Sequence, residues 1–219
     1  MKKYFEILKK CPLFFGIAEN DLLKMLPCLG AEVVKYDKRD TVFAEGSEAK
    51  NIGVLLSGGA ESVRYDYYGN KSIINKIDPP EVFGEAFACA EAKSLPISII
   101  AIDSSEIMLI NCSHILHTCS NNCAFHQQMI YNLMKDLASK TVIVHQRIEV
   151  TSKRSTREKL LAYLGIVSQQ KKSKSFKIPF NRQELADYLE VDRSGLSAEI
   201  SKMRKEGILE SERNYFKLL

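Results

Sequence analysis

The side chains best suited to metal binding or redox chemistry lie close together in residues 112–126. They are three cysteines and three histidines: Cys112, His114, His117, Cys119, Cys123 and His126. If the end of this segment is helical, Cys119, Cys123 and His126 share one face, because residues three or four positions apart are neighbours on a helix. Thiolate and imidazole groups are ligands for zinc, iron–sulfur clusters and haem iron. The segment is therefore a candidate metal or redox site.

The alternative for this cluster is plain packing. It contains no C-x-x-C pair, and cysteine often behaves as a small buried apolar side chain. No export signal precedes the six cysteines of the chain, so we expect reduced thiols and not a disulfide framework. No cofactor is required by the sequence, although a metal ion or haem would suit the cluster, and the cofactor stays unidentified.

A second group of candidate residues lies in the segment NRQELADYLEVDRSGLSAEISKMRKEGIL, residues 181–209. Its pattern predicts two helices, at 182–189 and 193–205, with Asn181 and Asp192 as N-cap residues. A short strand before this segment and two strand-like runs after it, on either side of residues 212–214, complete a winged helix-turn-helix.

The second of these helices has two distinct faces. Leu196, Ile200 and Met203 form the apolar face that we expect to be buried. The opposite face carries Arg193, Ser194, Ser197 and Lys202. Such side chains reach base edges or phosphates when the helix lies in a DNA groove. Residues 151–219 contain 15 Lys/Arg and 9 Asp/Glu, whereas residues 1–150 contain 16 and 18, which favours a separate polyanion-binding module at the C-terminal end.

The remaining elements must position these groups within a chain of 219 residues. Short β-rich runs between Gly and Pro turn signals fill residues 31–110 and predict an antiparallel barrel or roll. Residues 121–150 lack Gly and Pro and predict one long helix. We therefore predict an α+β fold with a β-roll sensing domain (1–120), a dimerisation helix (121–150) and a winged helix-turn-helix DNA-binding domain (151–219).

An apolar stripe runs along the predicted long helix. With Thr141 in the middle, it comprises Ile130, Leu133, Leu137, Val144 and Ile148. The spacing of three and four residues is typical of a coiled-coil seam. A seam favours a homodimer, and the alternative is a helix that packs on its own roll.

The chain resembles the Crp/Fnr superfamily of bacterial transcription regulators over essentially its whole length. The matching motifs are Glu45-Gly46, Leu56-Ser57-Gly58-Gly59, Val82-Phe83-Gly84-Glu85, Arg182-Gln183-Glu184-Leu185-Ala186, Val191-Asp192-Arg193-Ser194 and Glu206-Gly207-Ile208-Leu209. The resemblance implies a cyclic-nucleotide-binding-like jelly roll and a homodimer on double-stranded DNA with a two-fold operator. It also implies that Arg182 and Gln183 contact phosphates, and that an activator would contact RNA polymerase.

Two departures from the family pattern change these expectations. In the second helix, Ser194 and Ala198 stand where Glu and Arg are commonest, so the operator half-site should differ from the best-known ones. In the effector pocket, Leu95 and Pro96 stand where the cyclic-nucleotide binders have Arg and Ser or Thr.

Other positions of that pocket add to the second departure. The residues that we assign to it are Gly84, Glu85, Lys93, Leu95, Val142 and Ile143. Gly84 and Glu85 match the family, but Lys93 is the only cation near them in the sequence, and a flexible lysine is a poor substitute for arginine. We therefore predict an unidentified effector and no response to cyclic AMP.

Several classes of protein are excluded or less favoured. No apolar run is long enough to cross a bilayer, so we expect a cytoplasmic protein with no membrane partner. Gly-rich phosphate loops, nucleophile elbows and HExxH motifs are all missing from the sequence, so we expect no enzyme. The alternatives to an effector-controlled regulator are a metal- or redox-sensing regulator that uses residues 112–126, and a ligand-binding scaffold that does not act on DNA.

Overall fold

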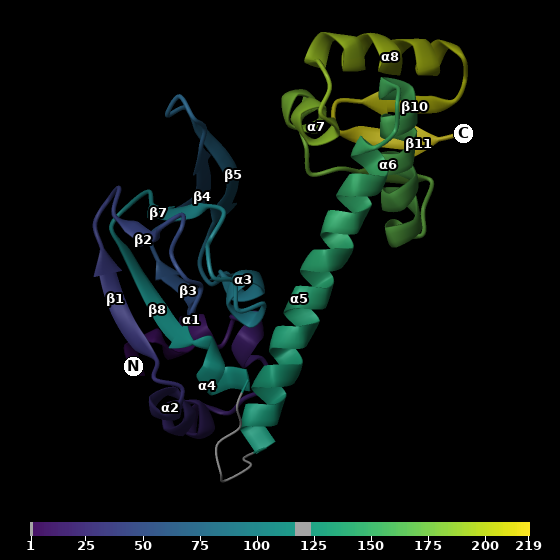
Figure 1. Ribbon diagram of the computed structural model, residues 1–219. Coiled ribbons are helices and arrows are strands. Elements are labelled where there is room, and N and C mark those ends of the chain that lie inside the picture. Colours follow the sequence, from purple (N-terminus) through teal and green to yellow (C-terminus); the bar gives the residue numbers. More distant parts are fainter. Residues whose placement is uncertain (1, 117–123) are drawn as a thin grey trace. The chain divides into compact units, whose positions relative to one another are not determined.

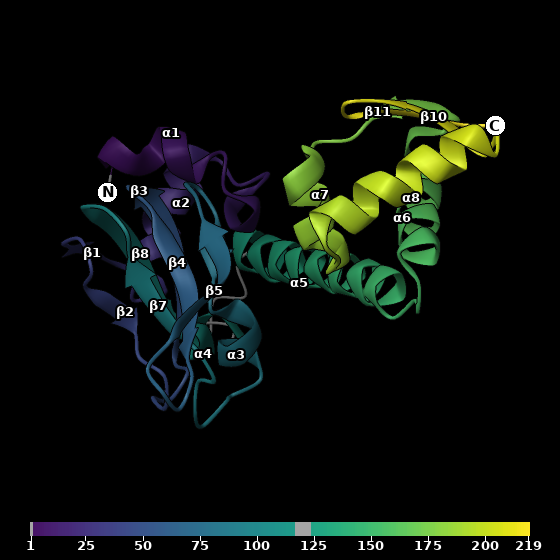
Figure 2. The same ribbon diagram turned by 90° about the horizontal axis from the view of Figure 1, so that it is seen from above.

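The computed structural model describes residues 2–116 and 124–219, and the chain divides into two compact units, residues 1–138 and 139–219 (Figures 1 and 2). The helices of the first unit are η1 (Lys2–Tyr4), α1 (Phe5–Leu8), η2 (Pro12–Phe14), α2 (Glu19–Cys28), α3 (Glu85–Cys89) and α4 (Cys112–Leu116). Its strands are β1 (Glu32–Tyr36), β2 (Thr41–Phe43), β3 (Asn51–Ser57), β4 (Ala60–Tyr65), β5 (Lys71–Ile77), β6 (Val82–Phe83), β7 (Ser98–Ala101) and β8 (Ser105–Asn111).

The second unit is built around three helices and a small sheet. Its elements are α6 (Thr156–Lys171), β9 (Ser175–Lys177), α7 (Arg182–Leu189), α8 (Arg193–Lys205), β10 (Leu209–Glu212) and β11 (Tyr215–Leu218). The long helix α5 (Ala124–Thr151) crosses the division, so its first half belongs to the first unit and its second half to the second. The predicted domain limits at residues 120 and 150 stay a prediction.

Two four-stranded antiparallel sheets form the β-roll of the first unit. Their strand orders are β1-β8-β3-β6 and β2-β7-β4-β5. Apolar side chains from both sheets pack together in a cluster of Leu55, Ala60, Ile77, Phe83, Ile99, Ile107 and Leu109. The predicted antiparallel roll and the α+β fold are thus confirmed.

A second core joins one sheet of the roll to the helices around it. Leu22 of α2, Ile52 of β3 and Met129 of α5 all belong to this core. So does Leu133, which is 2% exposed, while Ile130 and Leu137 pack against the same cluster. Three of the five predicted seam residues thus pack against the roll of their own chain, and the seam itself stays a prediction. The first half of α5 packs on its own roll, which was the alternative to the seam.

The shortest elements had no counterpart in the sequence prediction. α1, α3, β6 and α4 have two to five residues each, too few to show a helical or strand period. Helix α2 contains Pro27 and ends one residue after it.

The helices of the second unit enclose a core of their own. The strand order is β10-β11-β9, and the buried residues include Leu164 of α6, Leu185 of α7, Leu196 of α8 and Phe216 of β11. Helices α7 and α8 have the bounds that the sequence predicted. No helix of the described residues is long and apolar enough to cross a membrane.

Candidate nucleic-acid interface

The start of α8 is fixed by a side-chain cap. The Asp192 carboxylate accepts a hydrogen bond from the Gly195 backbone N–H at 2.8 Å and another from the Ser194 hydroxyl. The Ser194 hydroxyl and the Gly195 N–H hold the pKa of Asp192 below its ordinary value. Since a cap determines where a helix begins, it also determines which way Arg193, the first residue of α8, is directed.

The apolar face of α8 is buried as the sequence predicted. Leu196, Ile200 and Met203 all belong to the core of the second unit, together with Leu185 and Ala186 of α7. Burial of this face leaves the opposite face of α8 to the solvent, because a helix exposes the side away from its core.

The four residues predicted on the outer face differ in what their side chains can offer. Arg193 and Lys202 are exposed, and neither side chain forms a hydrogen bond or an ion pair with another described residue. The Ser197 hydroxyl donates to the Arg193 carbonyl oxygen at 2.9 Å, and the Ser194 hydroxyl is used in the cap. The two cations are therefore the groups on this face whose charge is available to a ligand.

The predicted phosphate contacts on α7 already have partners within the protein. The guanidinium of Arg182 lies 5.7 Å from the Phe216 ring centroid, and its Nη2 donates to the Arg213 carbonyl oxygen at 3.3 Å. Burial lowers the pKa of Arg182. Gln183 Nε2 donates to Asp187 Oδ1 at 2.8 Å. Arg182 thus ties the start of α7 to the wing.

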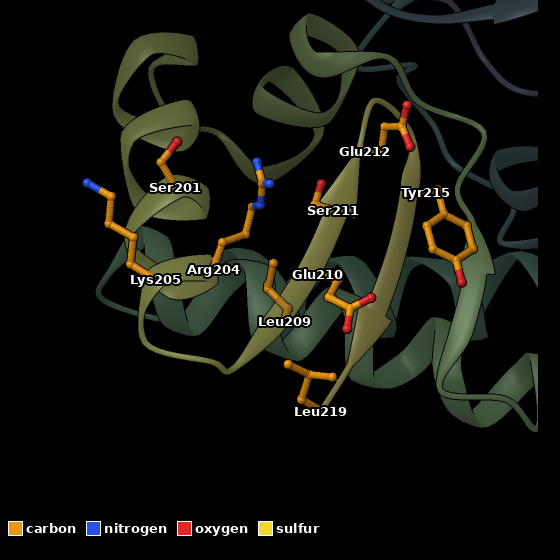
Figure 3. A pocket seen from close by; sticks show the side chains of 9 residues that line it. All are labelled: Ser201, Arg204, Lys205, Leu209, Glu210, Ser211, Glu212, Tyr215 and Leu219. Atoms are coloured by element: carbon orange, nitrogen blue, oxygen red, sulfur yellow. The ribbon is translucent and has the colours of Figure 1, made fainter.

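An open groove of about 710 Å³ separates the second half of α8 from the wing (Figure 3). It is lined by Ser201, Arg204, Lys205, Leu209, Glu210, Ser211, Glu212, Tyr215 and Leu219. Figure 3 shows that Arg204 extends over the groove toward Ser211, whereas Lys205 points away from the strands. An adjoining groove of about 460 Å³ is lined by Arg182, Arg204 and the wing-turn residue Arg213, among others.

Sequence reasoning missed the cations Arg204, Lys205 and Arg213 of this surface. Arg204 and Lys205 stand in the run KMRK at the end of the predicted helix, which was a signal that could have found them. Arg213 lies in the turn of the wing with a φ of 53°, a conformation that the sequence did not reveal.

Two ion pairs of a half-buried arginine connect α6 to α8. Arg157 of α6 contacts Glu199 of α8 through its Nε at 2.5 Å and Glu206 through its Nη1 at 2.8 Å. The Arg157 guanidinium holds the pKa of Glu206 below its ordinary value. A guanidinium that grips two carboxylates restricts orientation as well as distance, so Arg157 fixes how α8 presents its outer face.

Two residues of the predicted effector pocket, Gly84 and Leu95, line a small cavity in the roll. Its volume is about 150 Å³, and its lining residues are Phe43, Glu48, Ala49, Lys50, Asn51, Gly84 and Leu95. Gly84 has a φ of +77°, and a Cβ at this position would lie 2.7 Å from the Phe43 ring, so only glycine fits. Pockets that enclose small-molecule ligands usually have about 300–1,000 Å³. The cavity is too small to enclose a nucleotide.

The charges around this cavity do not favour an anion. Lys50, which sequence reasoning missed, forms an ion pair with Glu48 at 2.8 Å, and this pairing raises the pKa of Lys50. Lys93 is exposed and does not line the cavity. Leu95 is 4% exposed, and its backbone N–H donates to the Ser47 carbonyl oxygen at 2.8 Å. Neither a free cation nor the Leu95 amide is therefore available to a phosphate.

Two further residues of the predicted pocket, Val142 and Ile143, belong to the second unit and are exposed. Their contact with the pocket stays a prediction. Glu85 is the first residue of α3 and is buried.

The described part of the Cys/His segment is used in packing. His126 is buried, and its Nε2 lies 2.8 Å from the Ile115 carbonyl oxygen, within hydrogen-bond distance. His117, Cys119 and Cys123 lie outside the described residues. Within residues 2–116 and 124–219, no three His, Cys, Asp or Glu side chains are grouped so that they could hold a metal ion.

Comparison with known families finds two domains, which are separated by residues 123–157. Residues 33–122 match the cyclic nucleotide-binding domain, and residues 158–219 match the Crp-like helix-turn-helix domain. No protein among those with a curated description matches the chain.

Several solved structures share the fold across most of the chain. The catabolite activator protein of Thermus thermophilus is 19% identical with a TM-score of 0.55, and the match covers 95% of this chain and 93% of that one. DNR from Pseudomonas aeruginosa is 18% identical, with a TM-score of 0.52 and coverage of 100% and 95%. The c-di-GMP-responsive regulator CLP of Xanthomonas campestris is 14% identical, with a TM-score of 0.52 and coverage of 90% and 97%. At sequence identities this low, the matches show only that the fold is shared.

Proposed function

The chain belongs to the Crp/Fnr family of transcription regulators, and we propose that it binds a two-fold DNA operator as a homodimer. Its Crp-like helix-turn-helix domain makes it a DNA-binding regulator. We further propose that it acts in the cytoplasm, that it has no enzymatic activity, and that any activation proceeds through contact with RNA polymerase.

The observation that carries the DNA-binding proposal is the outer face of α8. Asp192 caps this helix, and Arg157 of α6 forms an ion pair with Glu199 on it. Arg193 and Lys202 lie on its exposed face, and neither side chain has an ion pair with another described residue. A rigid helix with free cations on one face fits the major groove, where arginine contacts guanine bidentately and lysine contacts phosphates. Arg193 is therefore proposed as the base-reading residue and Lys202 as a phosphate contact.

Residues next to the α8 face extend this interface. Arg204 and Arg213 line grooves between α8 and the wing, so we propose that they contact the backbone beside the major groove. Arg182 and Gln183 lie where α7 begins and have partners within the protein, so we propose that they mainly orient the wing and support a phosphate contact only secondarily.

The homodimer is supported by a stripe of α5 that the roll leaves uncovered. Tyr131, Met134 and Ile148 are large apolar side chains that are more than half exposed. With positions 138, 141 and 145 between them, they follow spacings of 3, 4, 3, 4 and 3. This is the spacing of a heptad, with Thr141 and His145 as its polar positions, and we propose that the stripe is buried against a second copy.

The revised stripe differs from the predicted seam by about one residue. Val144 and Ile148 of the predicted seam are exposed and stay at the proposed interface. In the first half of α5, Tyr131 and Met134 replace Ile130, Leu133 and Leu137, because the latter three pack on the roll.

The effector is proposed to be something other than a cyclic nucleotide. The roll offers a cavity of about 150 Å³ whose nearest cation, Lys50, is paired with Glu48. Burial of an uncompensated phosphate charge is expensive. A small neutral ligand would fit better.

The test of this function is selection of DNA from a randomised duplex library by the purified full-length protein. We expect enrichment of a palindrome whose half-sites are centred about one helical turn apart, and binding that weakens steeply with salt. Retention of unselected sequences with equal affinity, or binding that is indifferent to salt, would instead support a scaffold that does not act on DNA.

A further inference from the structure

Two cysteine thiols meet in the first unit, away from the helix-turn-helix. Cys89 is the last residue of α3 and Cys112 is the first residue of α4. Their sulfur atoms are 3.5 Å apart, within hydrogen-bond distance for sulfur. The two residues are 23 positions apart in the sequence, so tertiary structure brings them together.

The backbone holds both cysteines against the same short segment. The Cys112 N–H donates to the Lys50 carbonyl oxygen at 2.9 Å. Three residues after Cys89, the Ala92 carbonyl oxygen accepts from the Ala49 N–H at 3.0 Å. Because Ala49 and Lys50 are neighbours in the chain, these hydrogen bonds hold the last residue of α3 close to the first residue of α4.

The two thiols differ in their access to solvent. Cys89 is partly exposed, whereas Cys112 is 2% exposed and belongs to the core beneath the roll. An accessible thiol beside a buried one is the arrangement in which the first reacts with an external oxidant and the second resolves the product.

We propose that Cys89 and Cys112 form a redox modification site, which closes to a reversible intramolecular disulfide on exchange with a low-molecular-weight disulfide such as oxidised glutathione. The sulfur atoms must approach from 3.5 Å to about 2.05 Å, the length of a disulfide bond. The site lies in the sensing domain, and its existence does not depend on DNA binding.

The electrostatics of the pair determine which thiol attacks first. The hydrogen bond with Cys112 lowers the pKa of the Cys89 thiol, although burial and the Glu85 carboxylate oppose this shift. The same pairing, burial and Glu91 raise the pKa of Cys112. Since the thiolate is the nucleophile, Cys89 is the attacking residue.

The exchange proceeds in two balanced steps. The Cys89 thiolate attacks one sulfur of the low-molecular-weight disulfide, and one thiolate leaves, which takes up the proton that Cys89 had released. Cys112 then loses its proton, attacks the Cys89 sulfur and expels the second thiol. Overall, two protein thiols are oxidised to one disulfide, and one small disulfide is reduced to two thiols.

A metal-binding role for the same pair is less well supported. A structural zinc site needs four ligands, and the described residues offer no group of three suitable side chains anywhere. Two sulfurs in near contact, with no third ligand beside them among these residues, favour a bond between the sulfurs themselves.

The experiment is a redox titration of the full-length protein after treatment with a chelator. The protein is equilibrated in glutathione buffers of different potential, acidified, alkylated with N-ethylmaleimide and digested for peptide mass spectrometry. We expect a peptide pair that links Cys89 to Cys112 and disappears with dithiothreitol. For this two-electron couple, the ratio of disulfide to dithiol should change about tenfold for every 30 mV.

Single variants separate the two roles. Cys112→Ser removes the resolving thiol, so glutathione should remain attached to Cys89 as a mixed disulfide. Cys89→Ser should leave Cys112 largely without glutathione, since that thiol is buried. Cys28→Ser is the matched control, because Cys28 is an exposed thiol elsewhere in the unit and its loss should leave the yield of the linked peptide unchanged.

Two results would overturn the proposal. One is that Cys89 and Cys112 stay fully alkylated at the oxidising end of the titration. The other is that Cys89 forms its disulfide mainly with Cys119 or Cys123. In that case the Cys119→Ser/Cys123→Ser double variant would form no disulfide at Cys89. The wild-type titration depends on no variant that could misfold, and it contains no DNA, so its failure is distinct from a failure of the proposed regulator function.

Discussion

Substitution of Arg193 by alanine removes one charged group from the proposed base-reading position and changes little else. Arg193 is exposed at the first position of α8 and has no ion pair with another described residue. Alanine is a good helix former, and loss of a cation from a helix N-terminus is electrostatically favourable. The Asp192 cap does not involve the Arg193 side chain. We therefore expect the melting temperature to be unchanged or slightly raised.

The effect on DNA affinity is set by the number of contacts that are lost. A bidentate arginine–guanine contact contributes about 1–3 kcal/mol. A homodimer loses one such contact in each half-site, so the total loss is about 2–6 kcal/mol. At 1.4 kcal/mol for each factor of ten, operator affinity should fall by roughly 30-fold to 20,000-fold. Preference at one base pair of each half-site should be lost.

Fluorescence anisotropy with the selected operator and with single-base variants of it measures both effects. Lys202→Ala is the matched control, because it removes the same charge from the same face of α8. It should weaken binding to every sequence alike, and it should reduce the salt slope by roughly one unit per protomer.

Unchanged affinity and unchanged base preference in Arg193→Ala would refute the assignment of α8 to the groove in this register. A uniform loss across all sequences would show that Arg193 contacts phosphate and not a base edge.

Three further experiments test other parts of the structure. The double variant Met134→Asp/Ile148→Asp should dissociate the dimer in sedimentation experiments, because like charges would be buried across the two-fold axis. The comparison variant Leu133→Ala should instead lower the free energy of unfolding by about 2–5 kcal/mol, because Leu133 is a core residue. Isothermal titration with cyclic AMP should show no binding tighter than about millimolar, close to −4 kcal/mol, since Lys50 is already paired. Asp192→Asn should flatten the acid-induced fall of the melting temperature between pH 7 and about pH 3. Because the pKa of Asp192 is lowered, the stabilisation by its carboxylate is complete above the ordinary aspartate pKa and is lost as pH falls through the folded-state pKa. An asparagine cap does not titrate, so it keeps its contribution over the same pH range.

Each of these three has an outcome that would contradict it. An intact dimer in the Met134→Asp/Ile148→Asp protein would place the interface elsewhere. A micromolar dissociation constant for cyclic AMP would mean that Lys50 leaves Glu48 and that the cavity opens. An equal acid shift in Asp192→Asn and in the wild type would assign the acid sensitivity to other carboxylates, such as Glu206 beside Arg157.

The sequence alone determined the parts of this protein that depend on local patterns. Helices α7 and α8 have the predicted bounds because their caps, Asn181 and Asp192, lie next to the residues that they cap. The strands of the roll were predicted for a similar reason, since each is a short β-rich run between turn residues that are close to it in the sequence. A short element such as α3 has no period to reveal it.

Only the tertiary structure decided which side of α5 is free. In the first half of α5, the predicted seam and the exposed stripe are one residue apart, which is a rotation of about 100° on a helix. Both follow a spacing of three and four residues, so the spacing alone could not tell them apart. The contact of Leu133 with the core of the first unit decides between them, and Met134 is left 61% exposed.

Contacts between distant segments were likewise beyond the sequence. Lys50 and Gly84 line one cavity, the Arg182 guanidinium lies over the Phe216 ring, and Cys89 meets Cys112. Each pair joins residues that are more than twenty positions apart, and no local period connects them. Caps and amphipathic patterns arise from neighbours in the chain, whereas the partners of Arg182 and Cys89, and the approach of Lys50 to Gly84, are set by how the sheets and helices pack.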